Sequence, residues 1–270
     1  MKTLNYQVSQ SSLEQTVILE NDELRTTFIK GPLKGHPKTL IIIPAFNEEK
    51  NIGAVLDAIQ QKAPGVPILV INDGSNDKTE SVARSHGANV ISLPFNSGYG
   101  VALQTGFKFA ARKNYAIVIQ MDSDGQHDPK SVQELIKEVQ KDDVDVVIGS
   151  RFLENCTYKT SWARHAGIFI FGKIASVFCG QKVTDPTSGF QALKGKAIHF
   201  AASDHYPPDY PDADFIILMH RYGLKVKEIP VTMHASPDKE SMHHGHKTIY
   251  YIFKMFLSIF VTVLRNVSKG

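Results

Sequence analysis

The chain has 270 residues, of which 42% are hydrophobic and 21% charged, so it can bury a full globular core. A formal net charge of +3 is too small for the concentrated basic face that nucleic-acid binding requires, and we expect no nucleic-acid partner. The two cysteines, Cys156 and Cys179, form neither a disulfide framework nor a metal-ligand pattern. This usage is typical of reduced thiols in a cytoplasmic protein.

Three parts of the chain differ in composition. Residues 1–37 are polar, contain two short candidate strands near Val17 and Phe28, and end in Gly-Pro turn signals, so they are interpreted as an N-terminal appendage or linker. Residues 38–235 carry the regular pattern of one domain. Residues 236–270 combine a basic, histidine-rich loop with an apolar helix. The first residues lack the apolar core of a signal peptide.

Strand and helix patterns alternate from Thr39 onward. This alternation predicts an α/β fold, with a mostly parallel sheet flanked by helices and joined by right-handed crossovers. After about Ser161 the pattern loosens into helices with two further short strands. Strands are expected over residues 40–43, 67–71, 89–93, 116–121, 144–148, 191–193 and 226–228, and helices over 52–59 (capped by Asn47), 78–85, 101–109 and 129–140.

Each of the first four predicted strands is followed by a polar cluster. A single Asn-Asp-Gly-Ser segment is ordinary turn chemistry, but four clusters at four strand ends indicate a binding site. In open α/β sheets such strand ends open on one ligand crevice. The clusters are Pro44 to Glu49, Asn72 to Asp77, Pro94 to Gly100 and Asp122 to His127.

Asp122 and Asp124 are the most informative pair, because they end a strand that is apolar on both faces. Two carboxylates so close repel each other unless a cation lies between them. A hard divalent metal that also holds the phosphates of a nucleotide would supply that charge.

The remaining clusters indicate how a nucleotide would be held. Asp73 is a candidate acceptor for a base N–H, and Glu49 for a ribose hydroxyl. Gly98 and Gly100 permit close backbone approach to a ligand. Three common alternatives are excluded, because the sequence contains no P-loop, no dinucleotide-binding Gly-x-Gly-x-x-Gly after the first strand, and no Gly-x-Ser-x-Gly nucleophile turn.

The motifs resemble family 2 glycosyltransferases, and among them dolichyl-phosphate mannosyltransferases and bacterial enzymes that act on undecaprenyl phosphate. The similarity covers about residues 38–232. It implies a GT-A fold, a nucleotide-sugar donor, Mg²⁺ or Mn²⁺, and inversion at the anomeric carbon. The motifs run in the order Ile43 to Glu49, Ile71 to Ser75, Asn96 to Ala102, Asp122 to His127, Gly149 to Phe152 and Thr184 to Phe190.

Positions carried over from that resemblance give an expected donor site. The metal would be held by Asp122 and Asp124, with Gln126 nearby. In the polyprenyl-phosphate branch two arginines bind the acceptor phosphate, and Arg151 and Arg164 match them. The full set expected to hold the nucleotide-sugar is Pro44, Ala45, Asn47, Glu49, Asp73, Gly98, Gly100, Asp122, Ser123, Asp124 and Lys247.

The acceptor stays open between a polyprenyl phosphate and a glycan hydroxyl. Many polyprenyl-phosphate members carry two or four C-terminal spanning helices, and this sequence shows none. A hydroxyl acceptor needs a catalytic base, whereas an ionised phosphate does not. Asp214, or Asp212, falls where hydroxyl-acceptor members carry that base. Helix N-terminal capping is the alternative role for these two residues.

The last part of the chain offers two further features. Lys239, His244 and Lys247 are candidates to neutralise the leaving diphosphate, with a solvated loop as the alternative. The apolar run 249–264 contains Lys254 and is shorter than a membrane span. It predicts a helix that packs in the core, forms a homo-oligomer interface, or lies on a membrane surface next to a lipid-linked acceptor.

These observations favour a metal-dependent inverting glycosyltransferase of cell-envelope polysaccharide synthesis, with a UDP-sugar as the favoured donor. It would be cytoplasmic, with peripheral attachment to the inner face of the membrane as one option. The alternative is a non-catalytic, nucleotide-binding scaffold subunit of a glycan-synthesis complex. A nucleotidyltransferase is disfavoured, because Pro44 to Asn47 lacks the Gly-rich, basic loop that those enzymes place after the first strand.

Overall fold

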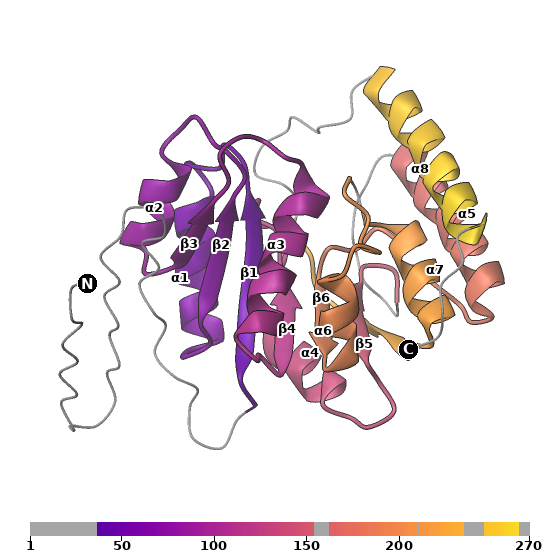
Figure 1. Cartoon of the computed structure of the whole chain (residues 1–270), viewed down its shortest axis with the longest axis horizontal. Coiled ribbons are helices and arrows are strands. Elements are labelled where there is room, and N and C mark those ends of the chain that lie inside the picture. Colours follow the sequence, from indigo (N-terminus) through magenta and orange to yellow (C-terminus); the bar gives the residue numbers. More distant parts are fainter. Residues whose placement is uncertain (1–36, 154–161, 210, 235–245, 265–270) are drawn as a thin grey trace, which may run out of the picture.

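Seven strands form one sheet in the order β3-β2-β1-β4-β6-β5-β7 (Figure 1). The computed structural model describes residues 37–153, 162–209, 211–234 and 246–264. The strands are β1 (Thr39–Ala45), β2 (Ile68–Asn72), β3 (Asn89–Ser92), β4 (Ile117–Gln120), β5 (Val146–Ser150), β6 (Gln191–Lys194) and β7 (Val226–Pro230). All neighbours pair in parallel except β6, which runs antiparallel to both β4 and β5. The predicted mostly parallel α/β sheet is confirmed.

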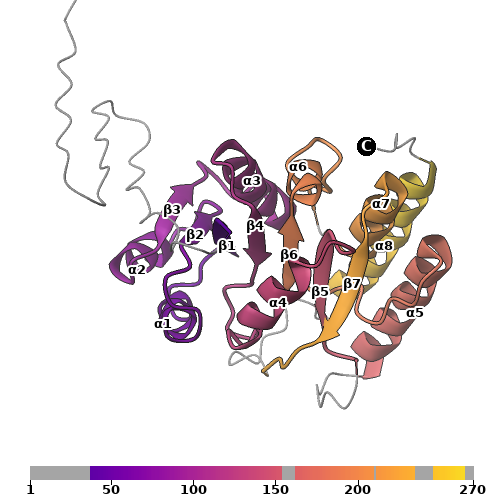
Figure 2. The same ribbon diagram turned by 90° about the horizontal axis from the view of Figure 1, so that it is seen from below.

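Helices cover both faces of this sheet (Figure 2). One buried cluster joins the sheet to α1, α2 and α4, and a second joins it to α3, α5, α6, α7 and α8. The helices are α1 (Ile52–Lys62), α2 (Thr79–Ser85), α3 (Tyr99–Arg112), α4 (Ser131–Val139), α5 (Trp162–Cys179), α6 (Lys196–Ala201), α7 (Ala213–Tyr222) and α8 (His246–Leu264).

The continuous apolar run of β1 follows from this layering. Leu40 and Ile42 pack into one cluster, while Ile41 and Ile43 pack into the other, and all four side chains are fully buried. Each such side chain stabilises the fold by about 1.5–3 kcal/mol through burial of apolar surface. A strand that is apolar at every position therefore lies in the middle of the sheet.

The residue that caps helix α1 differs from the one predicted. Its N-cap residue is Asn51, whereas Asn47 has a φ of 57° and lies in the preceding loop. The prediction that Asn47 caps this helix was therefore wrong. The asparagine amide tolerates the left-handed conformation, and the side chain bonds to the loop after β2 instead.

The predicted C-terminal helix is present as α8, and it packs on α7. Met255 and Ile259 are buried in the same cluster as residues of α7, so this helix shares the core of the preceding domain. Among the described residues, none of the helices has the length and apolarity needed to cross a membrane. The appendage predicted over residues 1–37, with its two candidate strands, lies outside the described residues except for Pro37.

Candidate functional site

The loops that follow β1 and β2 are bonded to each other. The Asn47 N–H donates to Ser75 Oγ at 2.9 Å, and the Asn76 N–H donates to Asn47 Oδ1 at 2.9 Å. The Lys78 N–H donates to Glu49 Oε2 at 3.0 Å. Two expected donor ligands, Asn47 and Glu49, therefore stand on a loop that is fixed against its neighbour. Pro44 and Ala45 lie directly before it as the last, buried residues of β1.

Asp73 holds a third loop in place. Its Oδ1 accepts the Ser97 N–H at 2.8 Å and its Oδ2 accepts the Gly98 N–H at 2.9 Å. The Asp73 side chain is 3% exposed, and its own N–H donates to the Ala45 carbonyl. A carboxylate has about four acceptor positions, so these two bonds leave room for the expected base N–H. Asp73 thus ties the ends of β1, β2 and β3 together.

Gly98 and Gly100 are constrained for different reasons. Gly98 has a φ of 101°, a conformation that favours glycine. A Cβ on Gly100 would lie 2.4 Å from the Pro207 carbonyl oxygen, and the Gly100 N–H donates to the Asp209 carbonyl at 2.8 Å. At Gly100 the close approach in the structure is to the chain's own backbone, and approach to a ligand stays a prediction.

The Asp122 carboxylate is oriented from two sides. Tyr99 Oη donates to Asp122 Oδ1 at 2.7 Å. Burial, together with this carboxylate, raises the pKa of Tyr99 well above 10.0, so the phenol remains a donor at neutral pH. The Asp122 N–H donates to His127 Nδ1, which leaves the ring proton on Nε2, 3.4 Å from Asp122 Oδ2.

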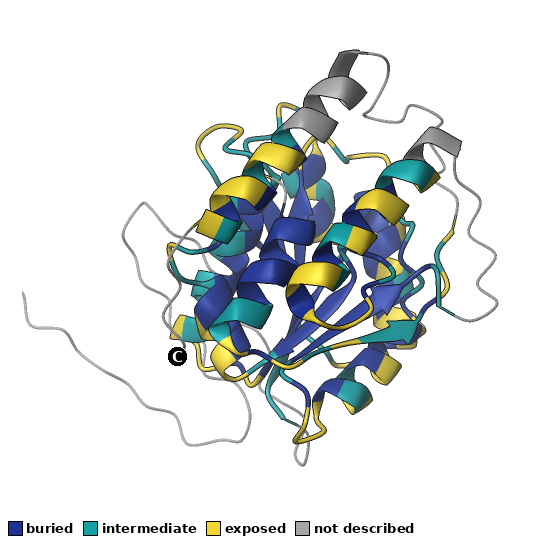
Figure 3. Cartoon of the chain, turned by 90° about the vertical axis from the view of Figure 1, so that its right-hand side faces the viewer, coloured by how far each residue is buried: buried dark blue, intermediate teal, exposed yellow. Residues whose placement is uncertain are grey.

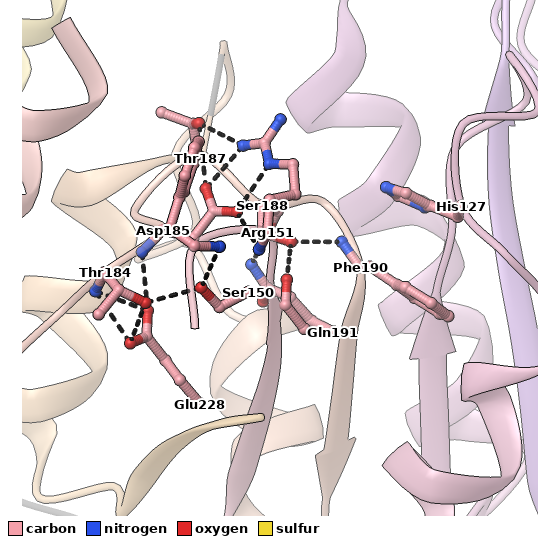
Figure 4. Close-up of polar contacts among 12 residues, drawn as sticks. His127, Ser150, Arg151, Thr184, Asp185, Thr187, Ser188, Phe190, Gln191 and Glu228 are labelled. Atoms are coloured by element: carbon pink, nitrogen blue, oxygen red, sulfur yellow. Dashed lines mark hydrogen bonds and ion pairs between the residues drawn. The ribbon is translucent and has the colours of Figure 1, made fainter. Parts of the chain in front are cut away.

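His127 is itself rigidly held. Its ring is 5% exposed and stacks on Phe190 with the centroids 4.8 Å apart (Figure 4). Next to Phe190, a Cβ on Gly189 would lie 2.9 Å from both Asp122 Oδ2 and Tyr99 Oη. The residues just before β6 therefore lie against the Asp122 carboxylate, because β6 is antiparallel and starts where β4 ends.

Asp124 and Gln126 occupy the turn that follows. The Gln126 N–H donates to Asp124 Oδ1 at 3.0 Å, and the Gln126 carbonyl accepts the His234 N–H at 2.8 Å. A bridge between His127 and Met233 adds to this contact, so the segment after β7 is paired with the turn. Ser123, between the two aspartates, is buried.

These side chains fit a hard divalent cation whose shell is shared with a substrate. The part of the chain that the structure describes contains no group of three or more His, Cys, Asp or Glu residues placed as metal ligands. Mg²⁺ is commonly bound through one or two carboxylates, with substrate phosphates and water completing an octahedron. Asp122, Asp124 and Gln126 carry side-chain oxygens of that kind, and their binding of a metal stays a prediction.

Arg151 is bound within a buried polar network at the end of β5 (Figure 4). Its Nε donates to Asp185 Oδ2 at 2.7 Å and its Nη2 to Asp185 Oδ1 at 2.6 Å. Nη2 also donates to Thr187 Oγ1 at 2.8 Å. Arg151 is 3% exposed and Asp185 fully buried. The arginine expected to bind an acceptor phosphate is therefore already paired in this structure.

The loop that carries Asp185 is fixed from below by Glu228 of β7. The Glu228 carboxylate accepts the N–H groups of Thr184 and Asp185 and the hydroxyl of Thr184. Burial raises the pKa of Glu228 above its ordinary value. Thr184 and Glu228 also line a cavity of about 260 Å³ beside β7, which none of the expected donor ligands borders.

The two candidate bases differ in environment. Asp214 is 1% exposed and accepts the Phe215 N–H at 2.8 Å, the Asp212 N–H at 3.1 Å and the Ser258 hydroxyl of α8. Burial raises the pKa of Asp214. Asp212 is half-buried at the N-cap of α7, and its charge contributes to the raised pKa of Tyr99.

Several expected residues are not tested by this geometry. Arg164 lies in α5 and Lys247 in α8, but their side chains are outside what the structure describes. Lys239 and His244 fall in the undescribed segment 235–245.

Tyr99, His127, Asp185 and Gly189 were not predicted as site residues. Each stands inside a motif that the sequence displays, so motif membership was the available signal. Tyr99 and Asp122 are 23 positions apart in the sequence, and Arg151 and Asp185 are 34 positions apart. Such contacts follow only from strand order and direction.

Comparison with known proteins agrees with this arrangement. A family model described as "Glycosyl transferase family 2" matches residues 40–200. An uncharacterised protein of Methanocaldococcus jannaschii is 37% identical over 71% of this chain and 79% of its own length. The polyprenol monophosphomannose synthase of Mycolicibacterium smegmatis is 29% identical over 72% and 77%.

A solved structure has the same GT-A fold. Glucosyl-3-phosphoglycerate synthase from Mycobacterium tuberculosis, in complex with Mn²⁺, UDP-glucose and phosphoglyceric acid, aligns with a TM-score of 0.66. The alignment covers 87% of this chain and 82% of that chain at 21% identity.

Proposed function

The chain belongs to glycosyl transferase family 2, and on that premise we propose that it moves a hexosyl group from a UDP-sugar to a polyprenyl phosphate, with a divalent metal and inversion at the anomeric carbon. The observation that carries this proposal is the Asp122 carboxylate, which Tyr99 and His127 orient beside the bonded loops of β1 and β2. That arrangement would combine a metal ligand with the strand ends that we propose bind the nucleoside.

Asp122 and Asp124, with Gln126, would hold Mg²⁺ or Mn²⁺. The ion supplies Lewis-acid stabilisation of the charge that develops on the departing diphosphate. Tyr99 and His127 act on the ligand itself, since hydrogen bonds around a metal-binding carboxylate fix its orientation. Glu49 and Asp73 would hold the ribose and the base.

The surroundings of Asp214 favour a phosphate acceptor over a hydroxyl. Its carboxylate is fully buried and accepts three hydrogen bonds, so it is poorly placed to take a proton from an incoming hydroxyl. A phosphate oxygen is already ionised and needs no base. The similarity to a polyprenol monophosphomannose synthase supports the same choice.

Arg151 has a defined part in this proposal. Asp185 already neutralises the charge of Arg151. Arg151 would therefore bind the acceptor phosphate mainly through directed N–H hydrogen bonds, and would add little net positive charge. The additional positive charge would come from Arg164 and Lys247. With such an acceptor, the enzyme would work at the inner face of the membrane, where its donor is available.

A glycan hydroxyl is the second candidate acceptor, and Asp212 would be its base. Asp212 is half-buried, whereas Asp214 is buried, and the charge of Asp212 contributes to the raised pKa of Tyr99, which bonds to Asp122. An Asp212→Asn variant that keeps full transfer to a glycan hydroxyl would remove Asp212 as that base.

The test is transfer by the full chain from UDP-glucose, UDP-N-acetylglucosamine and GDP-mannose to undecaprenyl phosphate or to free sugars, with Mn²⁺ or with EDTA. We expect metal-dependent transfer to the lipid phosphate from a UDP-sugar. An Asp122→Ala, Asp124→Ala double variant should lose it, and Asp142→Ala, an exposed carboxylate between α4 and β5, is the matched control. Metal-dependent turnover that survives in the double variant would refute the site.

A further inference from the structure

The outer surface of α5 and α8 is unusually apolar. Among the described residues, nine of the eleven exposed large hydrophobic side chains lie on these two helices (Figure 3). They are Phe169, Ile170, Val177, Phe178, Phe256, Leu257, Phe260, Val261 and Leu264.

Both helices follow a helical repeat that separates an inner stripe from this outer one. In α5 the side chains of Ile168, Phe171, Ala175 and Cys179 are buried. In α8 the buried side chains are Met255, Ile259 and Thr262. The inner stripes supply the apolar side chains that pack into the core. The outer apolar residues are therefore not needed for that packing.

The two outer stripes belong to one surface, which we name the α5–α8 face and define by the nine exposed residues above. Both helices pack against α7, whose residues from Ala213 to Met219 are all buried. Phe171 of α5 and Phe256 of α8 contact each other with their ring centroids 5.3 Å apart. Exposed apolar side chains gathered on one side of a protein mark an interaction surface.

The charges on these helices are all positive. The sequences of α5 and α8 contain no Asp or Glu, but they contain Arg164, Lys173, Lys247 and Lys254. Lys173 is exposed within the apolar surface, with its Nζ 5.5 Å from the centre of the Phe169 ring. Apolar side chains interspersed with cations only are complementary to anionic lipid headgroups above an acyl layer.

We propose that the α5–α8 face docks on the surface of an anionic lipid bilayer, with both helices lying in the interface. The exposed Phe, Leu, Ile and Val side chains enter the boundary between headgroups and acyl chains, and Lys173 contacts the headgroups. Both helices begin at the end of the molecule where β4 and β5 end, so the docked surface adjoins the side that carries Asp122 (Figure 1). This inference deepens the proposed function by naming the surface through which the chain would reach a lipid-linked acceptor, and its vesicle test does not require transfer activity.

The primary experiment is sedimentation of the full chain with vesicles of phosphatidylcholine containing about a third phosphatidylglycerol. The wild type should bind. The pair Phe260→Gln and Val261→Gln, and separately the pair Phe169→Gln and Val177→Gln, should each weaken binding at least about tenfold. Phe95→Gln is the matched control, because Phe95 is 67% exposed in the loop after β3 and lies outside this face.

The dependence of vesicle binding on charge is an independent test. Lys173→Glu should weaken binding to the anionic vesicles by at least about fivefold, and high salt should weaken wild-type binding. Pure phosphatidylcholine vesicles should bind more weakly than anionic ones. Equal affinity for neutral and anionic vesicles would overturn the electrostatic part of the proposal.

The competing occupant of this surface is a second copy of the chain. A tight dimer in analytical ultracentrifugation that the Phe260→Gln, Val261→Gln pair dissociates, with no vesicle binding by the wild type, would overturn the proposal. Asp122→Ala should bind vesicles as well as the wild type does. This variant separates the two ideas, because loss of transfer with intact vesicle binding leaves the docking surface standing.

Discussion

The loops at the ends of β1 to β4 differ from the helices α5 and α8 in which side chains they expose and in how those side chains are held. In the loops, nearly every polar side chain has a partner: Asp73 holds two backbone N–H groups, and Tyr99 and His127 hold Asp122. On the helices, large apolar side chains face outward with cations among them. The loops are organised before a ligand arrives, whereas the helices are organised only on their inner side.

The difference indicates where each region receives its partner. A small charged ligand is bound best by groups that need not reorganise, and fixed loops provide them. A fluid surface such as a bilayer requires no fixed complementarity, only apolar area and charge of the right sign. A single substitution in the loops should therefore reduce ligand binding or transfer strongly. Substitutions on the helices should reduce lipid binding roughly in proportion to the apolar area removed.

The largest effect is expected in the buried polar network. Removing one member of a buried ion pair leaves an uncompensated charge, so Arg151→Ala should lower the free energy of unfolding by about 3–5 kcal/mol. Urea denaturation monitored by circular dichroism measures this. A double variant, Arg151→Met with Asp185→Leu, should recover most of the stability and still have a raised KM for the lipid acceptor. An unchanged KM in that variant would remove Arg151 from acceptor binding.

Next in size is the loss of Asp122, the proposed metal ligand. Asp122→Ala should reduce transfer by at least about a hundredfold, in line with the removal of one preorganised electrostatic contact. UDP release under saturating Mn²⁺ measures it, with thermal unfolding as the check that the fold is retained. A loss below tenfold would mean that the fixed loops do not carry the chemistry.

A smaller effect is expected when the packing around the Asp122 carboxylate is changed and its charge is kept. Gly189→Ala places a methyl group 2.9 Å from Asp122 Oδ2 and Tyr99 Oη, so one of them must move. We expect Mn²⁺ affinity in the presence of UDP to fall by about 10–100-fold, as for other changes around metal ligands. Gly167→Ala in α5 is the control, since a Cβ there meets nothing within 4 Å. Equal Mn²⁺ affinity in both variants would contradict the close packing of Gly189 on the site.

The smallest effect concerns Asp214 and pH. Burial raises the pKa of this carboxyl above its ordinary value of 3.8, so the folded state binds the proton more tightly than the unfolded state. The stability from this group is complete below its unfolded pKa and is lost as the pH rises through the raised folded pKa. The free energy of unfolding of the wild type should therefore fall relative to Asp214→Asn as the pH rises above about 4. The opposite slope would contradict the burial.

The sequence predicted the sheet and its strand ends well, because apolar runs and their alternation with helices are local signals. It could not predict the direction of β6, since a four-residue strand has the same period in either direction. The position of Gly189 against Asp122 depends on that direction and was therefore missed. The partners of Asp73 were missed for the same reason, because the loop after β3 is brought to it by the parallel pairing of β2 and β3.

The C-terminal helix shows a different limit. Its apolar residues cover almost the whole circumference, so periodicity alone could not decide which stripe faces the core. Packing on α7 selects Met255 and Ile259 and leaves Leu257, Phe260 and Leu264 outside. The hydroxyl of Ser258 donates to the buried Asp214 carboxylate. No local sequence pattern predicts this contact.

The contact between Gly100 and Pro207 has a further consequence. The Asp209 carbonyl accepts the Gly100 N–H, and the Asp209 carboxylate pairs with Lys254 of α8 at 2.8 Å. One short segment thus joins the start of α3, which carries Tyr99, to the helix that we propose contacts the lipid. If lipid docking changes donor affinity through this segment, thermodynamic reciprocity requires donor binding to change lipid affinity by the same factor.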